Sequence, residues 1–240
     1  MSRASDRAVI EPPRTLVVAA GAWILLALLL ALGTTLPLQI TPASLAPAIR
    51  ITLVTCLVGA LVAWPLARLS QGPGSGGVLN DLLQAATLGS LLQLVIWPLR
   101  LATPWTVERT LLIDLCALSS LVAVAGIVAV GSRSQRTTPR AIAMVACLVV
   151  AGGVRWPLAA AGAQDLALTL PFLGSCATVL ELMDATASMP DHEVWTHAQY
   201  SAVLSIALGA CGCAVAAFME AAGRRPPARA RGVAMQRRVG

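Results

Sequence analysis

Long apolar segments, separated by short polar connections, make up most of this chain. Each segment has about the 17–25 residues that a helix needs to cross a bilayer. Within a single segment, only a helix satisfies its own backbone hydrogen bonds in lipid. The apolar segments lie near residues 15–36, 51–69, 78–101, 106–131, 141–161, 166–183 and 199–221. The pattern therefore predicts an all-α, polytopic transmembrane helix bundle, with residues 1–222 forming the bundle.

The sixth segment is the weakest of the seven, and it leaves the number of spans at six or seven. It is short, contains Pro171 and Gly174, and ends in Glu181 and Asp184. Such a segment can tilt or stop before it crosses the bilayer. After the last segment, residues 223–240 are rich in Arg and Pro, a composition typical of disordered tails.

Composition strengthens the membrane prediction and excludes several functions. The chain is 57% hydrophobic and only 12% charged, whereas soluble domains have about 25% charged residues. Every basic residue is Arg, and the absence of Lys removes a Schiff base and a Walker A phosphate loop. We expect a multi-pass protein of the cell membrane whose main partner is the lipid bilayer. We expect no nucleic-acid partner.

Charged residues inside the apolar segments are the best pointers to a site, because each costs a few kcal/mol at mid-membrane on insertion scales. Asp114 lies about eight residues into the fourth segment, or about 12 Å along a helix. Arg155 lies near the end of the fifth segment, and the two helices are antiparallel, so we expect an Asp114–Arg155 pair. The pair would serve as structural glue or, less favoured, as part of a polar path for an ion or anionic solute. Further charged residues expected at the same membrane face are Arg100, Glu108, Arg109 and Asp165.

Other polar residues receive simpler explanations. Charged residues expected at the opposite face include Arg68, Asp81, Arg133, Arg136 and Arg140, and most of them lie near helix ends from which they can reach water. Gln84, Ser90 and Gln93 do not form one stripe along the third segment. We expect hydrogen bonds between helices from them rather than the lining of a channel.

The motif Trp-Pro-Leu occurs three times, beginning at Trp64, Trp97 and Trp156. Asp81 and Asp114 follow the first two tryptophans at the same offset of 17 residues. A decayed repeat would explain this spacing. The preference of Trp for the membrane interface explains it at least as well.

The thiols and imidazoles do not predict a cofactor or a metal. The six cysteines all lie in apolar segments, where a thiol behaves as a small hydrophobe. Cys211 and Cys213 are two residues apart, so they point away from each other on a helix, and we expect no disulfide. His192, Glu193 and His197 match no strong metal-binding spacing.

Small residues recur every fourth position along the last segment. They are Ser201, Ser205, Gly209, Cys213 and Ala217. Small residues at this interval allow helix backbones to approach closely in a membrane. We therefore expect a helix-packing surface here, within the bundle or with a membrane-protein partner.

No nucleophile–base pair can be assembled from these residues on one membrane face, which disfavours an enzyme. We expect an integral membrane component of a transport or other multi-protein membrane assembly, with the substrate unknown. One alternative is a membrane-embedded enzyme that acts on a lipid or a quinone. The other alternative is a self-sufficient carrier of small solutes.

Basic segments favour the cytoplasm, but here they conflict. The first 14 residues contain three Arg, residues 132–140 contain three, and the tail after Gly223 contains six. With seven spans, the tail cannot share a side with both of the others. Either the sixth segment does not cross, or the N-terminus lies outside. Both solutions predict a cytoplasmic C-terminal tail.

Overall fold

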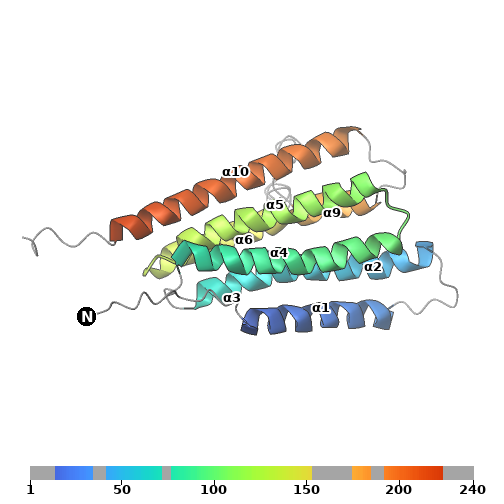
Figure 1. The fold of residues 1–240 in the computed structure, drawn as a ribbon, viewed down its shortest axis with the longest axis horizontal. Coiled ribbons are helices and arrows are strands. Elements are labelled where there is room, and N and C mark those ends of the chain that lie inside the picture. Colours follow the sequence, from blue (N-terminus) through green and yellow to red (C-terminus); the bar gives the residue numbers. More distant parts are fainter. Residues whose placement is uncertain (1–13, 35–41, 72–76, 153–174, 185–191, 224–240) are drawn as a thin grey trace, which may run out of the picture.

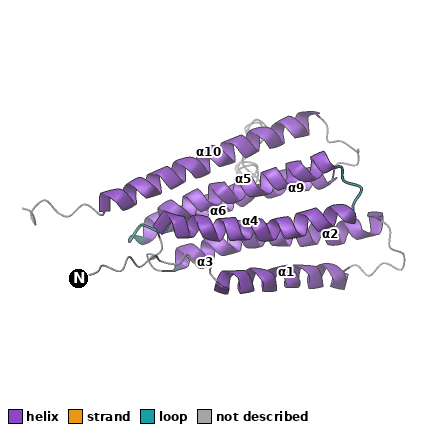
Figure 2. Ribbon diagram, in the orientation of Figure 1, coloured by secondary structure: helices purple, strands orange, loops and turns teal. Residues whose placement is uncertain are grey.

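The computed structural model describes residues 14–34, 42–71, 77–152, 175–184 and 192–223. Every regular element within these ranges is a helix, and the described residues contain no strand (Figure 2). The elements are α1 (Arg14–Thr34), α2 (Pro42–Val58), η1 (Gly59–Ala63), α3 (Trp64–Ser70), α4 (Gly77–Leu101), α5 (Val107–Gly131), α6 (Thr137–Gly152), α9 (Ser175–Asp184) and α10 (His192–Gly223).

The prediction of an all-α membrane bundle is confirmed. Among the described residues, five helical stretches are long and apolar enough to cross a membrane, and α6 is a shorter apolar helix. Large apolar side chains such as Val18, Leu94 and Phe218 lie on the outside of the bundle, which suits contact with lipid. The end of the fifth predicted segment and the start of the sixth lie outside the described residues.

Two helices begin earlier than the hydrophobic pattern predicts. The second predicted segment begins at residue 51, but α2 begins at Pro42 and contains Arg50. Proline is tolerated in the first helical turn because its missing N–H has no intrahelical acceptor there. Arg50 is exposed, and a charged side chain near a helix end reaches water without ending the helix.

The helices alternate in direction along the bundle (Figure 1). Helices α1, α4 and α6 run one way, and α2–α3, α5 and α10 run the other way. The end of α10 meets the α5–α6 turn, because Arg133 Nη2 lies 3.6 Å from Glu220 Oε2. We call this the Arg133 end, and the end where α5 begins the Arg109 end. The start of α1 and the end of α10 therefore face the same side, as an even number of crossings requires.

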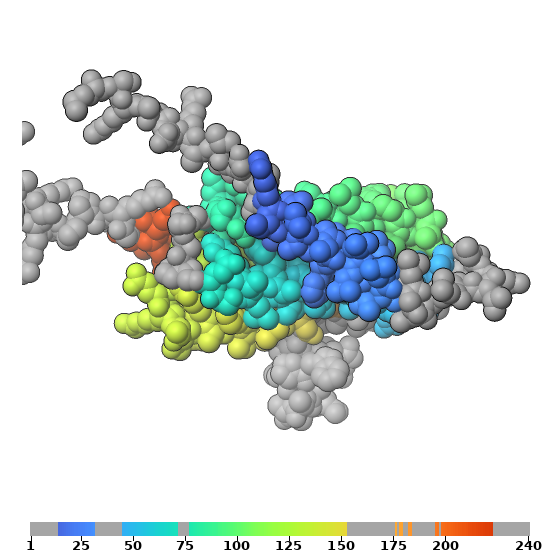
Figure 3. Space-filling view, turned by 90° about the horizontal axis from the view of Figure 1, so that it is seen from below, coloured from blue at the N-terminus to red at the C-terminus, as the bar shows by residue number. Residues whose placement is uncertain are grey.

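Helix α5 forms the centre of the bundle. In its span 72% of the residues are buried, compared with 11% in the span of α1. Helices α4, α6, α9 and α10 all pack on α5. Helix α1 packs instead on the outside of α2 and α4, and Figure 3 shows it lying over this face.

Glycines bring α5 and α10 into backbone contact. A Cβ on Gly126 of α5 would lie 2.8 Å from Gly209 Cα, and a Cβ on Gly212 would lie 2.7 Å from the Gly126 carbonyl carbon. Along α10, Ser201, Ser205 and Gly209 are buried. Close packing of this kind is how membrane helices associate when hydrophobicity cannot drive them together.

The last two members of the same small-residue stripe lie differently. Cys213 is half-buried and Ala217 is exposed. Gly212, rather than Cys213, makes the close approach to α5 next to Gly209. The stripe is thus used within the bundle over its first half.

A π-helical turn interrupts the second span. The turn η1 widens the helix between α2 and α3, and Trp23 of α1 packs against its first residue, Gly59. A Cβ on Gly59 would lie 2.6 Å from Trp23 Cδ1. The Trp23 indole N–H donates to the Thr55 carbonyl oxygen at 2.8 Å, one turn before η1. The contact fixes α1 to the second span.

Candidate functional site

Asp114 lies in the second turn of α5 and is only 7% exposed. Gln93 Nε2 donates hydrogen bonds to both carboxyl oxygens of Asp114, at 3.3 Å to Oδ1 and 3.1 Å to Oδ2. The Trp97 side chain also donates a hydrogen bond to this carboxyl group. Gln93 and Trp97 are four residues apart on α4, so they share one face of that helix. The α4–α5 interface therefore holds a buried carboxyl group between two neutral side chains.

The chemistry of this arrangement suits an ionised carboxylate. An ionised carboxylate only accepts hydrogen bonds, and the amide and indole N–H groups only donate. In the described part of the chain, no cationic group forms an ion pair with Asp114. The negative charge is thus solvated by hydrogen bonds without being neutralised.

A groove runs along the α4–α5 face and ends at Gln93. It encloses about 680 Å³, within the range of small-molecule sites. Ser90 and Gln93 are its polar lining residues, and the others are apolar or small. Gly89 lies in its floor, where a Cβ would come within 3.1 Å of Leu118 Cδ2. The groove thus connects the outer face of the bundle to the amide that binds Asp114.

Two other hollows lack ionisable carboxyl groups or cations. The more enclosed one lies between α1, the second span and α4, beside Trp23 and Trp64, and has a volume of about 230 Å³. The other follows α6 and is lined by apolar residues and Thr138. Because neither adjoins a charged group, the α4–α5 groove is the better candidate for a site despite its more open shape.

The predicted partners of Asp114 are placed only in part. Arg155 and Asp165 lie outside the described residues, so the Asp114–Arg155 pair stays a prediction. Arg109 is 4% exposed and its Nε donates to the Leu182 carbonyl oxygen of α9 at 2.7 Å. The remaining two members of the predicted polar cluster are Arg100, which is half-buried at the end of α4, and Glu108, which is exposed.

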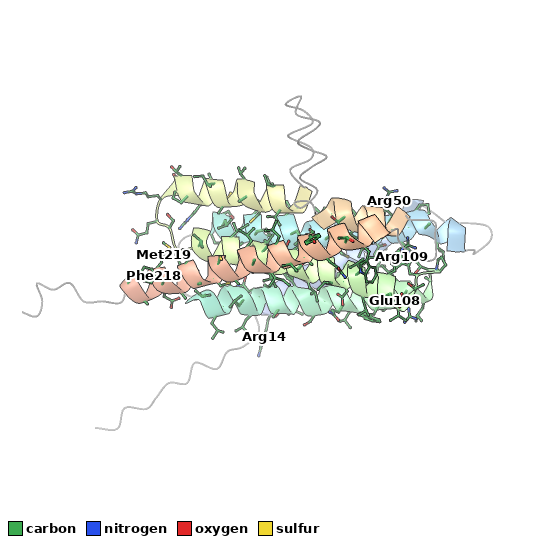
Figure 4. All side chains as sticks on the ribbon, turned by 90° about the horizontal axis from the view of Figure 1, so that it is seen from above. Arg14, Arg50, Glu108, Arg109, Phe218 and Met219 are labelled. Atoms are coloured by element: carbon green, nitrogen blue, oxygen red, sulfur yellow. The ribbon has the colours of Figure 1, made fainter. Side chains whose placement is uncertain are left out.

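Figure 4 shows that Glu108 and Arg109 lie near the same end of the bundle as Arg50, opposite Phe218 and Met219. Arg50 therefore adds a charge to this end that the sequence pattern does not assign to it. The Arg109 end is thus charged within the described residues, while Asp114 lies deeper along α5.

A second buried carboxyl group, Asp81, lies at the Arg133 end and is 1% exposed. Arg68 Nε lies 2.9 Å from its Oδ1, and Arg133 Nη1 lies 3.2 Å from its Oδ2. Ser132 also donates to Oδ2 at 3.2 Å. The expectation that most charges at this face reach water is wrong for Arg68 and Asp81. The ends of α3 and α5 and the start of α4 meet here and exclude solvent from both.

The Asp81 cluster extends to α10 through Glu220. Glu220 Oε2 lies 3.6 Å from Arg133 Nη2 and accepts a hydrogen bond from the Val78 backbone N–H at 3.3 Å. Sequence reasoning did not single out Glu220, because it is an isolated acid near a helix end. The two acids and two arginines balance in charge, which indicates a structural cluster.

The shared spacing of the Trp-Pro-Leu motifs does not produce a shared contact. Trp97 binds Asp114, 17 residues later, whereas Trp64 Nε1 donates to Gln84 Oε1 at 3.1 Å. Asp81 binds arginines instead. The first tryptophan contact thus joins α3 to α4, and the second joins α4 to α5, with different acceptors.

The thiols and the possible metal ligands lie apart from the groove. All six cysteines are free; Cys56, Cys116 and Cys147 are buried, and Cys211 is exposed. Among the residues that the structure describes, no group of three or more His, Cys, Asp or Glu side chains could hold a metal ion. No protein-family model, curated protein or solved structure matches this chain, and its function is inferred from its own residues.

Proposed function

We propose that this chain is the membrane-embedded component of a transport or other multi-protein assembly of the cell membrane. The observation that supports this function is the buried Asp114 carboxyl group, held by Gln93 and Trp97 beside a groove on the outer face of the bundle. Ionisable groups at such depth are costly and mark ion or substrate pathways in membrane proteins.

The comparison with Asp81 supports a functional rather than a purely structural role. Asp81 is neutralised by two arginines and joins three helices. Asp114 has amide and indole partners and no ion pair within the described residues. A carboxyl group kept only for packing could be replaced by an apolar residue at no cost in stability.

The shape of the bundle supports a subunit of an assembly. The described connections between helices, 102–106 and 132–136, are short, so they add little mass outside the membrane. The first half of the small-residue stripe of α10 packs on α5. A partner protein that binds through α10 would therefore use its outer face, which exposes Tyr200, Val203 and Phe218.

Extraction of the full chain with its surrounding lipids, followed by mass spectrometry, tests this proposal. We expect other membrane proteins to co-isolate in fixed proportion and to crosslink to a photoreactive residue placed at Val203. A matched photoreactive residue at the buried Ala202 should crosslink only within the chain. A chain that isolates alone, with no crosslinked partner from any exposed position of α10, would contradict the assembly role.

The groove also favours a second candidate, a membrane-embedded enzyme that acts on a lipid or a quinone. An apolar trough that ends in a hydrogen-bonding amide fits a long hydrophobic molecule with a polar head. Co-purification of such a molecule, with its conversion by the isolated chain, would favour this candidate. Solute uptake into liposomes that contain only this chain would instead favour a self-sufficient carrier.

A further inference from the structure

We propose that the groove between α4 and α5 binds a hydrophobic amine in its protonated form. Gln93 Oε1 accepts a hydrogen bond from the ammonium group, and Asp114 supplies the negative charge behind it. This inference rests on the proposed transport function and names the substrate class of the same site.

The groove itself selects a hydrophobic body. Its exposed rim includes Leu82, Ala86 and Val122, and its floor includes Gly89 and Ala125. Small residues leave room between the helices, and they offer no charged group along its length. A ligand in this groove exchanges contact with lipid for contact with apolar side chains, so binding selectivity comes from the polar end.

The polar end presents a hydrogen-bond acceptor. Both hydrogen bonds from Gln93 Nε2 go to Asp114, which turns Oε1 away from the carboxylate. The reverse orientation of the amide would place two oxygens against each other. Within the described residues, Gln93 Oε1 accepts no hydrogen bond, and the nearby carboxylate makes it a stronger acceptor. A ligand N–H donor completes this chain.

The charge of the site favours a cation over an anion or a neutral donor. Asp114 has no ion pair among the described residues, and charge-assisted hydrogen bonds are about twice as strong as neutral ones. The other described titratable groups have separate positions. On α5, Glu108 is exposed, Arg109 binds Leu182, and the Cys116 thiol faces the Ala198 carbonyl oxygen of α10.

The charged groups on the neighbouring helices leave the same conclusion. Arg100 lies in the last turn of α4, beyond Trp97. Arg68 and Glu220 belong to the Asp81 cluster at the Arg133 end. Arg140 of α6 binds the carbonyl oxygens of Ser134 and Gln71 at that end. None of these groups forms an ion pair with Asp114.

Proton binding to Asp114 would reverse the preference of the site. A protonated carboxyl group carries no charge and gains an O–H donor. The Gln93 amide can then turn its oxygen towards this donor and its NH₂ group towards the groove. An NH₂ group repels an ammonium ion, so uptake of one proton at Asp114 releases one bound cation. The site thereby couples protons to the ligand.

The full chain, reconstituted in nanodiscs of zwitterionic lipid, allows a direct test. The probe is dansylcadaverine, whose primary amine stays protonated below pH 9, because alkylammonium groups of the Lys type have a pKa of about 10.4. The matched neutral probe is N-pentyl dansylamide, which has the same chain length and no amine. Energy transfer from tryptophan to the dansyl group reports binding. We expect saturable binding of the amine, with at least about tenfold lower affinity for the neutral probe, which corresponds to about 1.4 kcal/mol.

Variants connect this binding to the two residues. We expect Asp114→Asn and Gln93→Leu each to weaken amine binding by about tenfold or more, while binding to the native chain decreases as the pH is lowered from 8 to 5. Gln84→Leu is the control, because Gln84 lies on the same helix and binds Trp64 rather than Asp114. Asp114→Glu serves as a charged substitute if the neutral variant does not fold, and it should retain binding and its pH dependence.

Equal affinity for the two probes would overturn the proposal, as would binding that survives both Asp114→Asn and Gln93→Leu. A groove filled by a lipid chain or by a partner helix predicts no saturable amine binding at any pH. Co-isolation of partner proteins is measured without the amine. The assembly role therefore stands if partners co-isolate while the amine fails to bind.

Discussion

Gly126 of α5 and Gly209 of α10 face each other with no side chain between them, and a Cβ on Gly126 would lie 2.8 Å from Gly209 Cα. We expect Gly126→Ala to lower the stability of the bundle by about 1–3 kcal/mol, the usual cost of overpacking, because backbone atoms cannot move aside. Thermal unfolding in detergent measures the loss. Gly21→Ala is the control, since nothing lies within 4 Å of its added Cβ. Equal melting temperatures for the two variants would contradict the contact.

Asp81 neutralises two arginines in a buried cluster. We expect Asp81→Asn to destabilise the protein by about 3–5 kcal/mol, because Arg68 would remain buried without its counter-charge. Glu220→Gln should cost less, about 1 kcal/mol or below, since the Glu220 side chain is 28% exposed. The ratio of the two losses, from denaturation curves in detergent, checks the assignment. A larger loss for Glu220→Gln would place the structural charge elsewhere.

Asp114 and Asp81 should differ in reactivity towards dicyclohexylcarbodiimide, a hydrophobic reagent that modifies protonated carboxyl groups. We expect labelling of Asp114, increasing as the pH is lowered, because the α4–α5 groove ends at its partner Gln93. Asp81 should stay unlabelled, because its arginines hold it ionised. Peptide mass spectrometry locates the adduct, and Asp114→Asn should abolish it. Preferential labelling of Asp81 would refute the distinction between the two sites.

The contact between Trp23 and Gly59 should secure α1 to the rest of the bundle. We expect Trp23→Phe to cost about 1 kcal/mol from the lost hydrogen bond to Thr55, in addition to lost packing. Gly59→Ala should push the Trp23 indole away, which would change tryptophan fluorescence without removing a tryptophan. Gly152→Ala, which meets nothing within 4 Å, provides the control. An unchanged spectrum for Gly59→Ala would show that Trp23 lies elsewhere.

The C-terminal tail is expected on the cytoplasmic side. The start of α1 and the end of α10 face the same side of the bundle (Figure 1), so an N-terminal reporter should give the same result as a reporter fused after Gly240. Activity of a periplasm-only reporter after Gly240 would contradict the cytoplasmic assignment. Opposite results at the two ends would instead support seven spans with an external N-terminus.

The length and apolarity of its segments predict much of this fold without tertiary information. A bilayer requires about 20 apolar residues in a self-satisfied helix, and α4 and α5 follow the predicted limits within one residue. The small residues of the last segment likewise indicate a close helix contact. The pattern does not identify the partner helix, because every helix in a membrane bundle is apolar on several faces.

Tertiary structure decides the roles of the charged residues. In the sequence, Asp81 and Asp114 are both single acids in apolar segments, each 17 residues after a Trp-Pro-Leu motif. Packing surrounds Asp81 with Arg68 and Arg133, and it gives Asp114 an amide and an indole instead. Hydropathy determines which residues enter the membrane. The rotation and crossing of neighbouring helices determine which side chains meet there, because lipid and apolar side chains offer nearly the same environment.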